Sequence, residues 1–315
     1  MTTTGTLADA ALVILNGKET GNEAVRAAIL ERREAGHRID VRVTWEEEDA
    51  ARFVEQAVRE GYGTLVAAGG DGTLRAVAEA MAQNHSRARL GLLPLGTAND
   101  FARAAGVPLE PAAALALLDG PTSAIDLVEA DGQLFLNMAT GGFGSQVTAN
   151  TPGELKRLLG GAAYLLTGLT RFAEVHSANG RFRGPGFEWE GEFLALGIGN
   201  GRQAGGGHVL CPTAVVNDGL LDVGILPASQ DMLGTLGEFL SNGFSTEEMF
   251  IRARLPWVEL EAAEGLDMNL DGEPVKRDRV RFEVRPGILQ VCLPVDSPLL
   301  GATAGTLAGA PAATS

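Results

Sequence analysis

Residues 67–80 read AAGGDGTLRAVAEA: a short apolar run ends in Gly-Gly-Asp-Gly-Thr, and helical spacing follows. The glycines let a ligand approach the backbone closely. The amides from Gly70 to Ala76 fall in the turn and in the first turn of the predicted helix, where unpaired N–H groups and the helix dipole favour a phosphate. The stretch therefore predicts a strand, a phosphate-binding turn and a helix. A plain glycine turn capped by Asp71 is the alternative.

The surrounding first third of the chain alternates strand-like and helix-like patterns. Apolar or alternating runs predict strands over 11–17, 38–45, 64–70 and 90–96. Helical spacing predicts helices over 22–36 and 46–61. This alternation is typical of a parallel sheet with helices on its faces, and ligands bind such sheets beyond the carboxyl ends of the strands. The glycine-rich breaks fall at those ends.

From about Ile125 the pattern changes to short strands bounded by glycine and proline. A hairpin with an Asp-Gly turn is predicted over 125–139. Further strands are predicted over 191–201, 219–226, 265–274, 279–286 and 287–294. Helical stretches interrupt them near Glu154–Val175 and Gln230–Leu240. This part is therefore expected to be mostly antiparallel, as in a sandwich or an open barrel.

Together these patterns predict two domains with a cleft between them. Residues 8–128 would form an α/β nucleotide-binding domain with a parallel sheet, to which residues 294–302 return. Residues 129–293 would form a mainly antiparallel, β-sandwich-like domain. The low-complexity residues 303–315 are expected to be a disordered tail.

Composition excludes several classes of protein. The formal net charge of −15 over 315 residues argues against nucleic-acid partners and against electrostatic docking on an anionic membrane. Cys211 and Cys292 are the only cysteines, which argues against disulfides and a cysteine zinc site. The four histidines lack metal-ligand spacing, and no serine-hydrolase elbow or P-loop motif occurs. With no signal peptide or membrane span expected, the sequence predicts a soluble, cytoplasmic protein.

A second glycine break, LLPLGTANDFARAAG over 92–106, has the same pattern as the first: an apolar run ends in a Gly-Thr pair, and a predicted helix follows. Either Thr97 or Asn99 can cap the helix that follows, which is a purely structural role. Two Gly-Thr breaks at adjacent strand ends would nevertheless face one crevice, and Thr44 ends a strand on the same edge.

Two polar turns stand out in the later part of the chain. Asp218 lies in an Asn-Asp-Gly turn, and Asp271 and Glu273 lie in NLDGEP over 269–274. On spacing alone, ordinary turn chemistry with solvated carboxylates is the favoured interpretation of both.

The motifs GGDGT, PLGTANDFA, NMATGGFG, GIGNGRQAGGG, CPTAVVNDGLL and NLDGEP, in this order, resemble bacterial YegS-like lipid kinases of the diacylglycerol kinase catalytic-domain family. The resemblance runs from about Leu12 to Leu300. GGDGT alone is shared with NAD kinases. The resemblance implies an ATP-dependent kinase whose acceptor is a lipid hydroxyl, as in phosphatidylglycerol or diacylglycerol, with ATP and the acceptor meeting in the interdomain cleft.

The resemblance also implies site residues. The ATP contacts would be Thr44, Gly69, Gly70, Asp71, Gly72, Thr73, Leu74, Arg75, Ala76 and Thr97. Mg²⁺, with Ca²⁺ as an alternative, would be held by the Asp218 side chain and the carbonyls of Val215 and Leu220. Glu273 would be the general base. Arg75 and Ala76 depart from the family's usual Asn and Glu, and Arg75 can either compensate or alter nucleotide preference.

Five questions stay open from the sequence. A NAD-kinase-type phosphotransferase and a catalytically silent nucleotide-binding regulator are the alternatives to a lipid kinase. Transient membrane contact through the predicted helix over 154–172 is weighed against a packing role for it, because interfacial helices are usually more basic. The acceptor lipid, the native metal and the oligomeric state are not predicted.

Overall fold

A computed structural model describes residues 7–46, 48–142, 177–228 and 250–301. The helices predicted near Glu154–Val175 and Gln230–Leu240 and the tail predicted at 303–315 lie outside the described residues. None of the helices within these ranges is long and apolar enough to cross a membrane.

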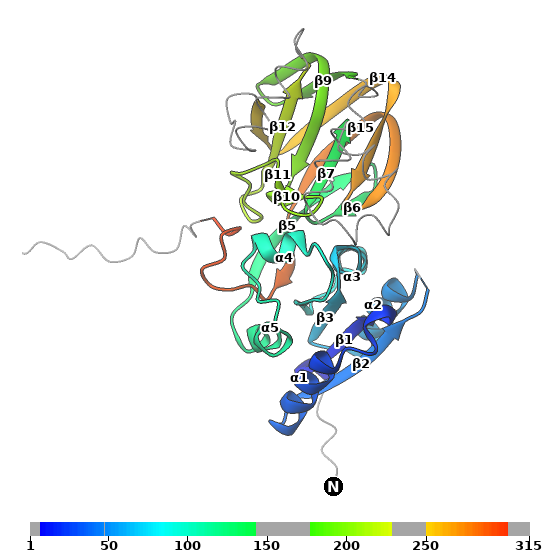
Figure 1. The fold of residues 1–315 in the computed structure, drawn as a ribbon, viewed down its shortest axis with the longest axis vertical. Helices are drawn as coiled ribbons and strands as arrows, with labels where there is room; N and C mark the ends of the chain where they lie inside the picture. The colour runs from blue at the N-terminus through cyan, green and yellow to red at the C-terminus, as the bar shows by residue number, and fades with distance from the viewer. Residues whose placement is uncertain (1–6, 47, 143–176, 229–249, 302–315) are drawn as a thin grey trace, which may run out of the picture.

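The N-terminal part of the chain alternates strands and helices (Figure 1). Its strands are β1 (Ala10–Asn16), β2 (Arg38–Thr44), β3 (Thr64–Gly69) and β4 (Arg89–Pro94). Its helices are α1 (Glu23–Glu34), α2 (Asp49–Glu60), α3 (Asp71–Gln83), α4 (Asp100–Ala104) and α5 (Pro111–Ala116), with 3₁₀ turns η1 (Leu7–Asp9), η2 (Gly17–Glu19) and η3 (Leu117–Asp119). The strands pair in parallel in the order β2-β1-β3-β4, so their carboxyl ends share one edge. The four predicted strands are confirmed to within two residues.

Helices cover both faces of these strands. On one face, Val54 of α2 and Val77 of α3 pack with Leu65 and other alternate strand residues. On the opposite face, Ile29 of α1 and Leu115 of α5 pack with the strand residues in between. Because both faces of β1, β3 and β4 are buried, these strands are continuous apolar runs in the sequence, whereas the edge strand β2 alternates.

The C-terminal part consists of strands. They are β5 (Ser123–Ala130), β6 (Gln133–Phe135), β7 (Met138–Gly142), β8 (Ala178–Gly184), β9 (Phe187–Gly199), β10 (Gln203–Ala204), β11 (His208–Val209), β12 (Leu221–Pro227), β13 (Ile251–Leu255), β14 (Trp257–Leu270) and β15 (Glu273–Val291). Pairs among these strands are antiparallel, and a second core fills this part around Phe182, Phe193 and Phe282. The predicted β5–β6 hairpin is confirmed, with its turn at Asp131 and Gly132.

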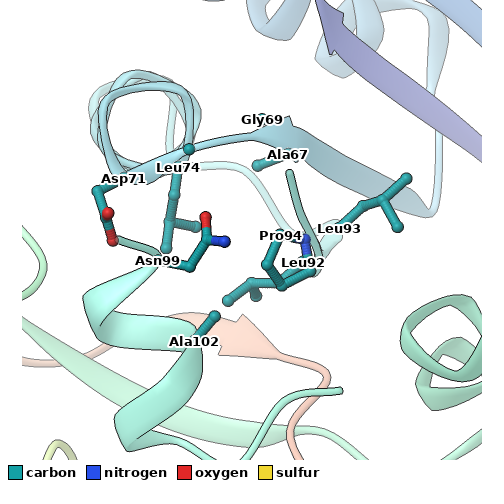
Figure 2. Close-up of a pocket in the computed structure, with 10 residues that line it drawn as sticks. Ala67, Gly69, Asp71, Leu74, Leu92, Leu93, Pro94, Asn99 and Ala102 are labelled. Atoms are coloured by element: carbon teal, nitrogen blue, oxygen red, sulfur yellow. The ribbon is translucent and has the colours of Figure 1, made fainter. Parts of the chain in front are cut away.

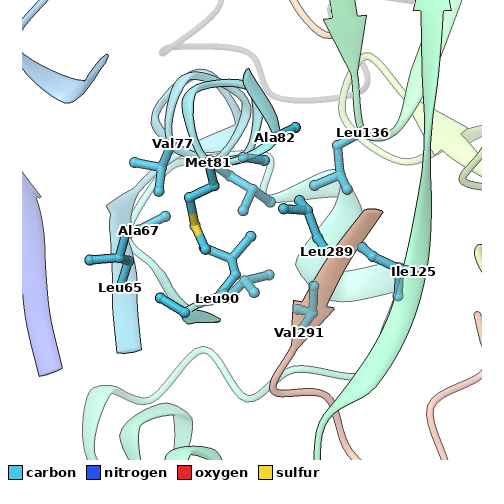
Figure 3. Packing of buried hydrophobic residues seen from close by; sticks show 14 of the residues in the cluster. Leu65, Ala67, Val77, Met81, Ala82, Leu90, Ile125, Leu136, Leu289 and Val291 are labelled. Carbon is cyan, nitrogen blue, oxygen red and sulfur yellow. The ribbon is translucent and has the colours of Figure 1, made fainter. Parts of the chain in front are cut away.

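Strand β15 joins the two parts into one 13-stranded sheet. It begins against β14, and its end pairs in parallel with β4 through Gln290 and Val291. Figure 3 shows Leu289 and Val291 of β15 beside Met81 of α3 in the core of the N-terminal part. Residues of β15 belong to the hydrophobic cores of both parts, so this strand does not mark where one domain ends and the other begins. The domain boundaries at 128 and 293 stay predictions.

Two strand expectations were wrong. The residues predicted as one strand over 265–274 contain a turn at Asp271 and Gly272, where β14 ends and β15 begins. The residues predicted as separate strands over 279–286 and 287–294 form a single strand that ends at Val291. Gly287 takes a φ of 61°, and the register with β5 shifts between Arg285 and Leu289. A local bulge at Pro286-Gly287 therefore replaces the predicted break, because glycine absorbs the irregular backbone without ending the pairing.

Candidate active site

The two glycine breaks touch each other at the carboxyl ends of β3 and β4. A Cβ built on Gly96 would lie 2.6 Å from the Cα of Gly70, so only hydrogen fits between the two backbones. Asn99, at φ 50°, accepts a hydrogen bond from the Gly96 amide at 2.9 Å and donates one to the Gly96 carbonyl at 2.7 Å. The side chain of Asn99 therefore shapes the second turn, and it does not cap α4 as one interpretation had it.

Asp71 does not cap α3, as the alternative of a plain glycine turn had predicted, because the residue at the N-cap position is Gly70. It is the first residue of α3, and its Oδ1 accepts a hydrogen bond from the amide of Phe101, at the start of α4, at 3.4 Å. Burial raises the pKa of the Asp71 carboxyl, and the nearby charge of Asp100 raises it further. Figure 2 shows Asp71 and Asn99 on the lining of one small pocket between β3, β4, α3 and α4. The carboxylate therefore belongs to the crevice that the two turns share.

The first turn of α3 is arranged for an anion. The amides of Thr73 and Leu74 both bond to the carbonyl of Gly70, whereas the Gly72 amide has no acceptor among the residues that the structure describes. A Cβ on Gly69 would lie 2.3 Å from the Thr73 hydroxyl oxygen, so glycine is required there. The amide and the helix dipole favour a phosphate at this point.

Asn16 links this turn to the edge strand and was not singled out from the sequence. Its Nδ2 donates to the Thr73 hydroxyl at 3.0 Å, and its backbone lies in register with Thr44 on β2. Thr44, Asn16 and Thr73 are therefore neighbours along one edge, while Thr97 is exposed on the β4–α4 turn. The available signal was an asparagine at the carboxyl end of a buried strand.

A glycine loop of the C-terminal part closes on α4. Asp100 is 6% exposed, and its carboxylate accepts hydrogen bonds from the amides of Gly206 at 2.9 Å and Gly207 at 2.7 Å. Gln203 donates to the Asp100 carbonyl at 3.1 Å. The sequence offered only the Asn-Asp pair after Gly-Thr as a signal for Asp100. These contacts hold the N-terminus of α4 against the β10–β11 turn.

The interpretation of Asp271 as a solvated turn residue is wrong. Its carboxylate accepts hydrogen bonds from the backbone amides of Leu136 at 2.7 Å, Asn137 at 3.1 Å and Met138 at 2.7 Å. Burial raises the pKa of Asp271 to about 6, although the three amides and the charge of Arg75 act in the opposite direction. Asp271 therefore anchors the β14–β15 turn to the segment before β7.

Glu273 follows that anchored turn and reaches α3. Its Oε1 accepts a hydrogen bond from Nη2 of Arg75 at 2.9 Å, and its side chain is 40% exposed. The structure therefore brings the candidate base and the candidate phosphate helix into direct contact, although the two residues are 198 positions apart.

The candidate metal ligands, Val215, Asp218 and Leu220, lie on the segment between β11 and β12. Asp218 accepts a hydrogen bond from the Leu220 amide at 3.0 Å and forms an ion pair with Arg254. Asp126, which the sequence did not single out, accepts hydrogen bonds at 2.7 Å from the amides of Gly219 and Gly287. Burial raises the pKa of Asp126, against the effect of those amides.

The donor set fits a hard cation. The carbonyls of Val215 and Leu220 accept no hydrogen bond within the described ranges, so their lone pairs are free. Two carbonyls and a carboxylate are the oxygen ligands that Mg²⁺ and Ca²⁺ take. No group of three or more His, Cys, Asp or Glu side chains in the described part of the chain could hold a metal. The carbonyl oxygens are therefore needed, and a cation there would share Asp218 with Arg254.

Comparison with protein families fits this architecture. Residues 10–130 match the diacylglycerol kinase catalytic domain, and residues 138–293 match the YegS C-terminal NAD kinase beta sandwich-like domain. Over 292 residues, the chain is 68% identical to a protein named probable lipid kinase YegS-like from Pseudomonas aeruginosa strain PAO1, covering 93% of this chain and 97% of that protein. The chain belongs to the YegS-like family of probable lipid kinases.

Other relatives agree. A protein of the same name from Pseudomonas fluorescens strain Pf-5 is 64% identical, over 92% of this chain and 97% of that protein. The crystal structure of a putative diacylglycerol kinase from Bacillus anthracis strain Sterne superposes with a TM-score of 0.77 at 23% identity, covering 91% of this chain and 98% of that one. That likeness shows the shared two-domain fold. The matched catalytic domain makes the YegS-like chain a phosphotransferase with an alcohol group as acceptor.

Proposed function

We propose that the protein transfers the γ-phosphate of ATP to a hydroxyl group of a lipid, with phosphatidylglycerol and diacylglycerol as candidate acceptors. The observation that carries the proposal is the contact between Glu273 and α3. It sets a carboxylate from the C-terminal part beside the helix whose first turn suits a phosphate. Phosphoryl transfer requires this pairing of a bound triphosphate with a group that orients the attacking hydroxyl.

The nucleotide is proposed to bind at the paired glycine turns. The triphosphate would lie over the first turn of α3, where, among the described residues, the Gly72 amide has no acceptor and a Cβ built on Gly72 would meet no atom within 4 Å. The full set of proposed contacts is Thr44, Gly69, Gly70, Asp71, Gly72, Thr73, Leu74, Arg75, Ala76 and Thr97, of which Leu74, Arg75 and Ala76 would contribute through the backbone and not through their side chains. The Asn16–Thr73 hydrogen bond supports this set, because it orients one hydroxyl of the turn.

Glu273 is proposed to be the general base. One carboxylate oxygen is held by Arg75, and Oε2 carries no hydrogen bond within the described residues. As the acceptor oxygen forms its bond to the γ-phosphorus and the bond to the β-γ bridging oxygen breaks, Oε2 would take the hydroxyl proton, and ADP would leave. Such a positioned base contributes about a hundredfold or more to the rate.

A divalent cation is proposed at the β11–β12 turn. Val215 and Leu220 would supply carbonyl oxygens and Asp218 a carboxylate oxygen, and Mg²⁺ is favoured over Ca²⁺. When bound, the cation supplies positive charge that counters the anionic groups of a phosphoryl-transfer site. The contact of Asp126 supports this proposal. Its carboxylate accepts a hydrogen bond from the Gly219 amide and so fixes the backbone between the candidate ligands Asp218 and Leu220.

Two further expectations complete the proposal. We infer that ATP and the lipid meet between the two parts of the chain, with any membrane contact transient. The segment over 154–172 proposed for that contact lies outside the described residues. We also infer a cytoplasmic location, which is supported by the two buried, unpaired cysteines, Cys211 and Cys292.

The test is label transfer from γ-labelled ATP, with Mg²⁺, to a panel of lipids in mixed micelles and to NAD as a soluble acceptor. We expect the label to appear in a lipid and not in NAD. Label in NAD alone would instead establish an NAD-kinase-type phosphotransferase. Tight ATP binding without label in any acceptor would establish a nucleotide-binding protein that has lost catalysis.

A further inference from the structure

Arg75 lies between two carboxylates that come from different parts of the chain. Its Nη2 donates to Oε1 of Glu273 at 2.9 Å, and its Nη1 donates to Oε2 of Glu79, one turn further along α3, at 3.1 Å. The Arg75 side chain is 13% exposed and that of Glu79 is 18% exposed. The Arg75–Glu79 contact is therefore largely shielded from water, whereas the Glu273 side chain is 40% exposed and its ion pair with Arg75 is screened more by solvent.

The far end of this chain of contacts is also fixed. The second oxygen of Glu79 accepts a hydrogen bond from the Leu134 amide, on β6, at 3.3 Å. The contacts therefore run from the backbone of β6 through Glu79 and Arg75 to Glu273. Among the residues that the structure describes, the buried Nε of Arg75 has no acceptor, and the two carboxylates are the hydrogen-bond partners of the guanidinium there.

The direction of the Arg75 side chain bears on its role. One of its partners is Glu79, which lies one turn further toward the C-terminal end of α3. The proposed phosphates would bind at the opposite, N-terminal end of that helix. The cation is therefore neutralised by two carboxylates rather than presented to the nucleotide.

We propose that Arg75 is the positioning residue for the candidate base. It fixes one oxygen of Glu273, so that the other oxygen faces the acceptor hydroxyl at a set distance from the helix that holds the triphosphate. The inference rests on the proposed function, because it assigns Arg75 a part in the same transfer step. A half-exposed glutamate has several rotatable bonds, and a charge-assisted hydrogen bond restricts them before the substrate arrives.

The chemistry of arginine suits this task. A planar guanidinium can bind two carboxylates at once along fixed directions, whereas an ammonium acts as a point charge. Arg75→Lys should therefore keep the charge and lose part of the alignment. Arg75→Gln should lose both.

The experiment measures kcat for label transfer and the ATP dissociation constant separately for Arg75→Gln, Arg75→Lys and Glu79→Gln. Arg75→Gln should lower kcat by about tenfold to a hundredfold, because a misplaced catalytic group costs this much. It should change ATP binding by less than about threefold, since the backbone contacts of the turn remain. Arg75→Lys should recover part of kcat, and Glu79→Gln should lose less than Arg75→Gln.

A matched control is available on α2. Arg59 also forms an ion pair four residues apart on its helix, with Glu55 at 3.0 Å; the acid comes first here, and both side chains are exposed. Arg59→Gln should leave kcat and ATP binding unchanged. In a Glu273→Gln background, Arg75→Gln should cause no further loss, because residues that act as a unit are not additive.

Three kinetic or binding results would overturn the inference: a wild-type kcat in Arg75→Gln, a loss confined to ATP affinity, or a full additive loss in the Glu273→Gln background. A wild-type kcat in Glu273→Gln would instead count against the proposed base itself. A double-mutant cycle on unfolding by denaturant tests the contact without any acceptor. It should show that Arg75 and Glu273 stabilise the fold jointly, and purely additive effects would overturn the inference.

Discussion

The carboxylate of Asp271 accepts a hydrogen bond from the backbone amide of Met138 at 2.7 Å, across 133 positions of sequence. Leu136 and Asn137 donate to the same carboxylate, so three successive amides face one side chain. Two residues after Asp271 comes Glu273, which contacts α3. The position of the candidate base therefore depends on an acid that serves as an anchor for the backbone.

This anchor predicts a particular pH dependence of stability. The pKa of Asp271 rises from 3.8 to about 6 in the folded protein, so the folded state binds more protons than the unfolded state between these values. The free energy of unfolding should therefore fall as pH increases through this window, by about 3 kcal/mol at most from this group. Denaturant unfolding from pH 4 to 7 measures it.

Asp271→Asn is the control for that pH series, because asparagine does not titrate. The difference in stability between wild type and the variant should shift in favour of the variant as pH rises from 4 to 6. Parallel pH profiles for the two proteins would show that Asp271 titrates near its ordinary pKa.

The close approach of the two glycine turns predicts the effect of one added methyl group. Gly96→Ala places a Cβ 2.6 Å from the Cα of Gly70, so the two turns must separate. We expect the free energy of unfolding to fall by about 1–3 kcal/mol, as overpacking does. ATP binding should weaken as well, because the turns define the crevice.

Gly21→Ala is the matched control, since no atom lies within 4 Å of a Cβ at that position. Thermal unfolding and ATP titration of both variants make the comparison. Equal stability and equal ATP affinity in the two would mean that the Gly70–Gly96 contact has no role in either property.

Strands β1, β3 and β4 were predictable because burial on both faces leaves continuous apolar runs, and the edge strand β2 was predictable from its alternating pattern. The two glycine turns were predictable for a related reason, since parallel strands end at the same edge. The hydrogen-bond partners of the acidic residues were not predictable from the sequence. Asp126 bonds to Gly287, 161 positions away, and such a pairing leaves no periodic pattern in one sequence. Asp271 resembled any turn residue until the backbone amides around it were known.

The Asp218–Arg254 ion pair predicts competition at the proposed cation site. Arg254 also contacts Asp222 at 3.2 Å, so it places a positive charge beside the candidate ligand. Arg254→Gln should bind Mg²⁺ severalfold more tightly than wild type, because like charges at short range repel. Isothermal titration with Mg²⁺ alone measures this affinity.

Asp218→Asn provides the opposite case and should weaken Mg²⁺ binding strongly, since a carboxylate becomes a neutral amide. If Arg254→Gln and Asp218→Asn both bind Mg²⁺ as wild type does, the cation site lies elsewhere in the chain.

The central claim is that Glu273 takes the proton of an acceptor hydroxyl beside a triphosphate bound at α3. Its most direct test compares wild type with Glu273→Gln in the initial rate of label transfer from γ-labelled ATP to lipid, with ATP affinity measured in parallel. The rate in Glu273→Gln should fall by about a hundredfold or more, with ATP binding nearly unchanged. A wild-type rate of transfer in Glu273→Gln would contradict it.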